Sequence, residues 1–147
     1  MDGLSIPVQC SEDPLIQNAY FNGYHQDTMV NNIFLFSPEG KILFACFNAP
    51  GSWHDSNVAS PLITIVLDKL GNYKICVDQG FKRSGKLLNK FVGPISKKVR
   101  RNLSPVLRRA LIRLHNIYVS LRQASEWGMR ALQGSFSRLK SRLTYQQ

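Results

Sequence analysis

The sequence predicts an α/β fold in which helices cover a mixed β-sheet on both of its faces. Residues 30–36 and 41–47 form two apolar runs separated by turn-forming residues, which is the pattern of a β-hairpin. Because both runs are apolar on both faces, the sheet needs cover on both sides. From residue 104 onward, apolar residues recur every three or four positions, which predicts a long helix. A chain of 147 residues favours a single domain.

The first third of the chain supplies the start of the sheet. Apolar residues alternate in 2–8, which predicts a strand. Residues 9–27 are mostly polar and contain Pro14 and Gly23, so we expect a long, partly ordered loop. Residues 37–40 read Ser-Pro-Glu-Gly, and this order suits a tight turn between the two hairpin strands.

A helix and a short strand follow the hairpin. Ser60 and Pro61 are typical of an N-cap and a first helical turn, and Gly71 is typical of a helix end. Four consecutive β-branched or bulky residues in 63–66 keep a strand as the alternative. Residues 73–77 indicate a short buried strand.

The last half of the chain divides into a loop and a helical region. Residues 82–101 are basic and contain glycine and serine, which predicts a loop. Ser104 and Pro105 mark the next helix start. About 40 residues is long for one globular helix, so we expect a kink or break before residue 143. The single domain therefore comprises an acidic sheet half (1–80), a basic loop (81–103) and a C-terminal helical region (104–143).

Charge is distributed very unevenly along the chain. The net charge is +10, yet residues 1–80 hold eight acids and three bases, whereas residues 81–147 hold sixteen bases and one acid, Glu126. A basic half indicates a polyanionic partner such as DNA, RNA or an anionic membrane, with a solvated basic helix as the alternative. The candidate phosphate contacts are Lys97, Lys98, Arg100, Arg101, Arg122, Arg130 and Lys140.

Glu126 lies opposite the apolar stripe of the last helix when residues are placed 100° apart. In the structural interpretation it belongs to a solvated face and pairs with Arg122 and Arg130, four positions away on either side. The functional interpretation, developed below, makes it a metal ligand.

Membrane and secretory classes are not favoured. The longest nearly apolar stretch, 58–67, is about half the length that a membrane span needs. The first residues lack the basic and apolar regions of a secretory signal. The three cysteines are odd in number and form no Cys-x-x-Cys pair, which favours a reducing intracellular compartment.

Three acids lie on or just after predicted strands and a fourth lies on the last predicted helix, and together they could converge at one edge of the sheet. They are Asp2, Asp55, Asp78 and Glu126. Carboxylate oxygens are the ligands that Mg²⁺ prefers, and two such ions can stabilise the attacking and leaving oxygens at a phosphodiester. Asp55 precedes a predicted helix, so a helix cap is its alternative role. His54 beside it could bind metal or simply pack on Trp53.

Five segments carry a resemblance to a known family. They are DGLSIPV (2–8), YFNG (20–23), NAPGSWHD (48–55), VDQGF (77–81) and SEWGMRALQGSFSRLK (125–140). In this order they resemble the nuclease domain of Harbinger-type (PIF/Harbinger) transposases, in the variant associated with fungal members. The resemblance covers nearly the whole chain.

The resemblance implies a ribonuclease-H-like mixed sheet with flanking helices and a DDE nuclease site. It places Asp2, Asp55, Asp78 and Glu126 as ligands of Mg²⁺ or Mn²⁺, with Asp2, Asp78 and Glu126 as the catalytic set. The implied activity is cleavage of DNA strands: water attacks phosphorus and a 3′-hydroxyl is released, which can attack target DNA. The resemblance also implies a nuclear protein, with a separate DNA-binding partner as a further expectation. It specifies no oligomeric state.

Two departures from the family pattern affect these expectations. Asp2 is almost the first residue, whereas relatives have half a strand before this aspartate, so we expect a shortened first strand. Val77 stands where the family has a glycine before the third aspartate. A catalytically inactive transposase remnant, or a small basic nucleic-acid-binding protein, is therefore the alternative to an active endonuclease.

Overall fold

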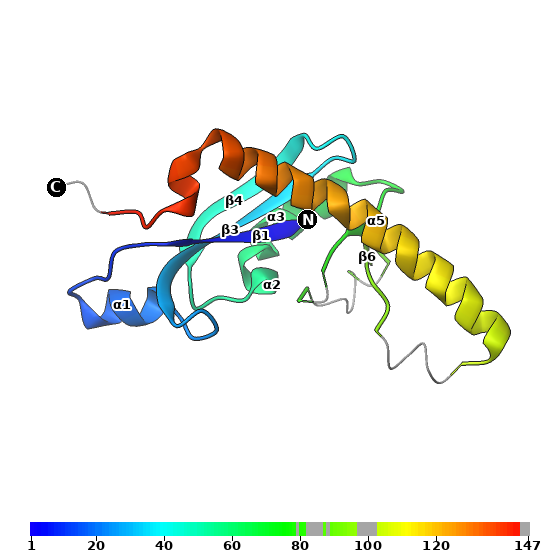
Figure 1. Cartoon of the computed structure of the whole chain (residues 1–147), viewed down its shortest axis with the longest axis horizontal. Coiled ribbons are helices and arrows are strands. Elements are labelled where there is room, and N and C mark those ends of the chain that lie inside the picture. Colours follow the sequence, from blue (N-terminus) through cyan, green and yellow to red (C-terminus); the bar gives the residue numbers. More distant parts are fainter. Residues whose placement is uncertain (79, 82–86, 88, 97–102, 145–147) are drawn as a thin grey trace.

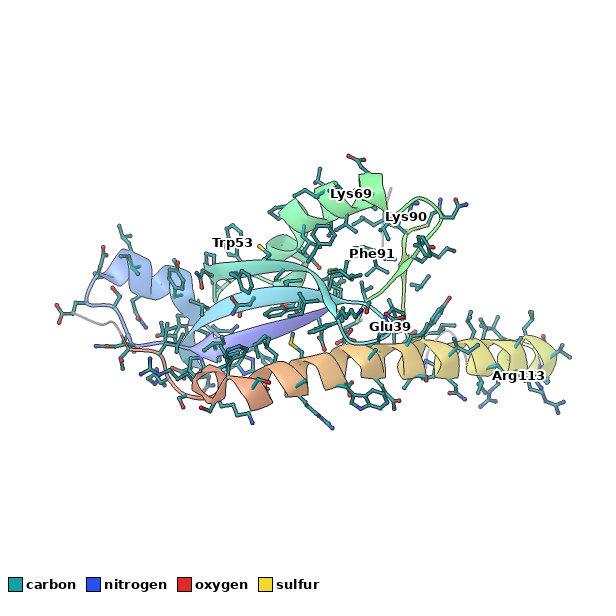
Figure 2. The ribbon with its side chains drawn as sticks, turned by 90° about the horizontal axis from the view of Figure 1, so that it is seen from above. Glu39, Trp53, Lys69, Lys90, Phe91 and Arg113 are labelled. Atoms are coloured by element: carbon teal, nitrogen blue, oxygen red, sulfur yellow. The ribbon has the colours of Figure 1, made fainter. Side chains whose placement is uncertain are left out.

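The computed structural model describes residues 1–78, 80–81, 87, 89–96 and 103–144, and it has three layers. A sheet lies between the long helix α5 (Pro105–Ser135) on one face and the helices α2 (Asp55–Val58) and α3 (Ser60–Lys69) on the other (Figure 2). The predicted α/β class, with helices on both sides of a sheet, is confirmed.

The central strand of the sheet is β3 (Asp27–Phe36). It pairs antiparallel with β1 (Asp2–Pro7) and with β4 (Ile42–Pro50), and its first residues pair with the short β2 (Phe21–Asn22) (Figure 1). The register of β1 runs from Asp2 opposite Phe34 to Pro7 opposite Met29. This register places Asp2 near the hairpin end of the sheet.

The predicted hairpin is confirmed, and its strands extend further than the apolar runs. In the turn, the Gly40 amide donates to the Ser37 carbonyl at 3.0 Å, and Gly40 has a φ of +83° that suits glycine. The strands gain length at their outer ends, where Thr28 and Ala49 are buried although the local sequence is polar.

Alternate side chains of β3 enter two separate clusters. Ile33 and Leu35 pack towards α2 and α3, whereas Phe34 and Phe36 pack with Met129 of α5. This alternation confirms that helices cover both faces of β3. Cover is thinner over β4, where Leu43 and Phe47 are more than half exposed.

Helix α5 approaches β3 closely at Gly128. A Cβ atom at this position would lie 2.5 Å from two ring carbons of Phe36, closer than side-chain carbons pack. Ser125, Gly128 and Met129 are accordingly the buried residues of the helix. Met129 is buried although it lies only three positions after Glu126, because the glycine lets this side of the helix approach the sheet.

The segment 9–27, expected to be a partly ordered loop, contains helix α1 (Pro14–Tyr20). Its start carries two helix signals: Asp13 caps it by accepting from the Leu15 amide at 2.8 Å, and Pro14 opens the first turn. None of its residues is buried, so it lacks the apolar stripe that would have predicted a helix.

The predicted helix near residues 62–70 is confirmed as α3, and the strand alternative is wrong. The N-cap position belongs to Ala59 rather than Ser60, because the short α2 leads directly into α3. Gly71 follows the helix with a φ of +50°, as expected of a helix end.

The predicted strand in 73–77 is confirmed as β5 (Ile75–Cys76). Its partner is the parallel strand β6 (Phe91–Val92), so the expected loop of 82–101 is wrong at these two residues. The buried Phe91 side chain anchors the strand in the core. The α-amino group of Met1 donates to the Cys76 carbonyl at 2.9 Å, which places β5 beside the start of β1.

The expected break in the last helix lies at Phe136, between α5 and the short 3₁₀ helix η2 (Ser137–Lys140). The first half of α5 projects beyond the sheet (Figure 1). Its apolar stripe is therefore largely exposed, as at Val106 and Ile117. After η2, Leu143 pairs with Val8 at the far end of β1 from Asp2. In the part of the chain that the structure describes, no helix is long and apolar enough to cross a membrane.

Candidate active site

The first two acids meet where β1 and β5 lie side by side. Asp2 begins β1, and its Oδ1 accepts the Gly3 amide at 3.0 Å. Asp78 follows β5 by two residues, and Met1 holds β5 against this end of β1 through the Cys76 carbonyl. Two strands from distant parts of the sequence thus bring Asp2 and Asp78 to the same edge.

Asp55 approaches this edge from the α2 side of the sheet. It occupies space that is open because Gly3 has no side chain. A Cβ atom on Gly3 would lie 2.9 and 3.0 Å from the two carboxylate oxygens of Asp55. Asp55 is the first residue of α2, and His54 holds the N-cap position. Asp55 therefore does not occupy the cap position that was its alternative role, and its carboxylate lies against β1.

The electrostatics of the three aspartates show that they share one environment. Burial raises the pKa of Asp2, and the negative charge of Asp78 acts in the same direction. Burial also raises the pKa of Asp55, followed by the charges of Asp2 and Asp78. The three carboxylates therefore repel one another at neutral pH, which is a destabilising arrangement unless a cation lies nearby.

Arg122 of α5 supplies such a cation and connects the fourth acid. Its Nη1 lies 3.3 Å from Oδ1 of Asp78, and its Nη2 lies 3.8 Å from Oε1 of Glu126. The expected pairing of Glu126 with Arg122 is confirmed. Among the described residues, no ion pair joins Glu126 to Arg130. Met1 secures α5 here as well, since its amino group lies 3.4 Å from the Ser125 hydroxyl oxygen.

The donor set suits a hard divalent cation in its chemistry. Carboxylate oxygens are available on Asp2, Asp55, Asp78 and Glu126, which come from four separate parts of the chain. The carboxyls of Asp2 and Asp55 have raised pKa values that a bound cation would lower. Within the described ranges, no three histidine, cysteine, aspartate or glutamate side chains are close enough to hold one ion together. The guanidinium of Arg122 instead lies between Asp78 and Glu126.

A family model described as DDE superfamily endonuclease matches residues 1–147. The chain belongs to this family. No curated protein and no solved structure matches it. The family match does not test individual site residues, so the assignment of Asp2, Asp78 and Glu126 as the catalytic set stays a prediction.

Three of the basic residues predicted to contact phosphate lie in the described part of the chain. Arg122 binds the acidic cluster, Arg130 is exposed on α5, and Lys140 is exposed in η2, towards the far end of β1. The other four fall outside the described residues; they are Lys97, Lys98, Arg100 and Arg101.

Sequence reasoning did not single out a second basic group, on the projecting half of α5. Arg108, Arg109 and Arg113 are exposed there, and Figure 2 shows Arg113 well away from the sheet. The charge count contained the signal, because the 81–147 half holds sixteen bases, but spacing along the sequence did not indicate which of them project from the body.

Two of the sequence motifs meet beside the acidic cluster. The Nδ2 atom of Asn22 donates to the Gly51 carbonyl at 2.8 Å, which ties the 20–23 motif to the 48–55 motif. A Cβ atom on Gly51 would lie 2.3 Å from the Tyr20 carbonyl oxygen and 2.4 Å from that of Met29. Only glycine fits this contact, which explains the residue in the motif.

Proposed function

We propose that this domain of the DDE superfamily endonuclease family cleaves DNA strands with the help of divalent metal ions. The observation that carries the proposal is the gathering of Asp2, Asp55 and Asp78 from three elements at one edge. Arg122 ties Glu126 to this group. Such a gathering is electrostatically unfavourable in a chain that does not use it, and it is a common feature of catalytic sites.

The four carboxylates have distinct roles in this proposal. Asp2 and Asp78 would hold the central Mg²⁺ or Mn²⁺ position, and Glu126 would hold a second ion from α5. Asp55 would complete the set from the α2 side. Bound cations would supply Lewis-acid stabilisation of the charge that develops on the phosphate oxygens. The chain's own task is to orient these carboxylates and to hold the phosphodiester over them.

DNA is the proposed substrate and partner. The exposed arginines Arg108, Arg109 and Arg113 lie on the projecting half of α5, where they would contact phosphates beyond the site. We further propose that the domain is a ribonuclease-H-like member of the Harbinger-type group, in its fungal-like variant, and that it acts in the nucleus. A separate DNA-binding protein is a proposed partner.

A plasmid assay tests the proposed cleavage. Supercoiled DNA incubated with the wild-type chain and Mn²⁺ should be nicked, whereas Asp78→Asn and Glu126→Gln should lose this nicking. Asp68→Asn is the matched control, because Asp68 is an exposed carboxylate on α3 outside the acidic cluster. The enzyme proposal would be rejected if all four proteins nick the plasmid equally, or if none of them nicks it.

One observation favours the alternative of a catalytically inactive nucleic-acid-binding remnant. Arg122 already neutralises Asp78 and Glu126, which is the arrangement of a structural ion-pair network. In this case the acid-to-amide changes would leave DNA binding intact or improve it. The affinity for duplex DNA should still fall with salt, at a logarithmic slope near −0.9 for each phosphate contacted.

A further inference from the structure

A hollow of about 540 Å³ opens directly beside the acidic cluster. Asp55 and Gly3 line one end of it, and two loops form its walls. The first, residues 22–25, comprises the last residue of β2 and most of its connection to β3. The second, residues 51–54, connects β4 to α2. Figure 2 shows Trp53 on the side of the sheet that faces α2 and α3. The volume lies within the usual range of small-ligand sites.

Aromatic and imidazole groups dominate these walls. Tyr24 is 91% exposed and Trp53 is 48% exposed, so both side chains are accessible from the hollow that they line. The rings of His25 and Tyr24 are nearly perpendicular, with their centroids 5.0 Å apart, and His54 lies in the other wall. Among the described residues of the lining, Asp55 is the only carboxylate.

The hollow is built on a rigid polar floor. Asn22 and Asn31 both donate to the Gly51 carbonyl, at 2.8 and 3.2 Å, and this shared acceptor joins the two loops. Asn31 also donates to the Trp53 carbonyl at 2.9 Å and accepts from the Ser5 hydroxyl at 2.7 Å. Because these amides fix the loop backbones, little conformational entropy is lost when a ligand binds.

We propose that this hollow binds an unpaired DNA nucleotide next to the phosphate that the acidic cluster cleaves, with its base stacked on Tyr24 or Trp53. The proposal rests on the proposed function and names the form of its substrate. Aromatic faces bind bases of any sequence by stacking. A base inside a duplex has both faces covered by its neighbours, so only an unpaired or extruded base can present a face to these rings.

Fluorescence of Trp53 tests this binding without any cleavage. The chain has two tryptophans, and Trp127→Phe leaves Trp53 as the only reporter. In EDTA at low salt, a duplex with a short unpaired overhang should quench Trp53, whereas the blunt duplex of the same sequence should not. In this background, Tyr24→Ala should weaken overhang binding at least about fivefold, as expected for the loss of one stacked base.

Two variants serve as controls for the fluorescence test. Tyr73→Ala removes a tyrosine that is 79% exposed outside the hollow and should leave binding unchanged. Trp53→Phe keeps an aromatic face and should bind the overhang duplex more tightly than Trp53→Ala. Fluorescence anisotropy measures binding by both variants. Equal quenching by blunt and overhang duplexes, or equal effects of Tyr24→Ala and Tyr73→Ala, would overturn the proposal.

Together, the fluorescence and nicking assays distinguish failure of the proposed nucleotide site from failure of the proposed endonuclease activity. Quenching by overhangs in a chain that does not nick plasmid supports the nucleotide site and rejects the enzyme. Nicking that Tyr24→Ala and Trp53→Ala leave unchanged, together with no quenching, rejects the hollow and keeps the enzyme. Tyr24 makes few contacts, since it is almost fully exposed, so its variant should keep the wild-type melting temperature.

Discussion

Replacing Arg122 by glutamine should lower the stability of the metal-free protein and increase the stabilisation that Mn²⁺ provides. The guanidinium lies 3.3 Å from Asp78 and 3.8 Å from Glu126, and these two acidic side chains are 45% and 47% exposed. Exposed ion pairs contribute about 0.2–1 kcal/mol each, and the longer pair belongs at the low end. Their loss should therefore cost about 1 kcal/mol, which lowers the melting temperature by roughly 2–4 °C in a domain of this size.

The same change frees two carboxylates for a cation. If Mn²⁺ must displace Arg122 to bind, removing about 1 kcal/mol of competition should tighten binding about fivefold. Thermal melting with and without saturating Mn²⁺ measures both effects, because a ligand that binds only the folded state raises the melting temperature. Glutamine has a similar helix propensity to arginine, so the helix itself is little changed.

Arg130→Gln is the matched control, since Arg130 is exposed on the same helix and no ion pair joins it to Glu126 in the described part of the chain. This variant should change neither the melting temperature of the metal-free protein nor the rise that Mn²⁺ causes. The reasoning fails if Arg122→Gln shows the same Mn²⁺-induced rise in melting temperature as the wild-type protein.

Three further changes test the packing and the charges around the site. Gly128→Ala should destabilise the fold by about 1–2 kcal/mol in chemical denaturation, because overpacking outweighs the gain in helix propensity, whereas Gly134→Ala, with open space around it, should not destabilise. Gly51→Ala should cost about 3 kcal/mol or more, since its Cβ would meet backbone that cannot move aside, and Gly23→Ala should be tolerated. Asp55→Asn should raise the melting temperature in EDTA at neutral pH, because burial raises the pKa of this carboxyl above its ordinary 3.8 and its ionised form destabilises the fold. This advantage should shrink as the pH falls through the raised pKa towards 3.8, and a constant difference would contradict the assignment.

The sequence predicted those features that depend on local patterns. The hairpin follows from two apolar runs and a Ser-Pro-Glu-Gly turn, and the end of α3 follows from Gly71. The pairing of Glu126 with Arg122 was also predictable, because residues four apart lie on the same side of a helix. These features require no knowledge of the rest of the fold.

Features that depend on distant segments were missed or misjudged. Strand β6 has two residues, and its strand character comes from a parallel partner, so no alternating pattern announces it. Met129 is buried because Gly128 lets α5 approach the Phe36 ring, which a helical wheel does not show. The bridge from Arg122 to Asp78 likewise joins residues far apart in sequence.

The candidate site shows the same division. The motifs named Asp2, Asp55, Asp78 and Glu126 in order along the chain, but not how they meet. The approach of Asp55 to β1 depends on the space above Gly3, which only the folded chain shows. The placement of Tyr24 and Trp53 around one hollow depends on the Gly51 carbonyl, which accepts hydrogen bonds from both Asn22 and Asn31. No spacing along the sequence indicates this contact.

The central claim is that Asp2 and Asp78, from distant parts of the sequence, hold a divalent cation. The most direct test is an electron paramagnetic resonance titration, in which the signal of free Mn²⁺ falls as the ion binds. The account predicts that the wild-type chain and Asp68→Asn bind Mn²⁺ equally, and that Asp78→Asn loses this binding. Binding by Asp78→Asn with the wild-type affinity would contradict the claim.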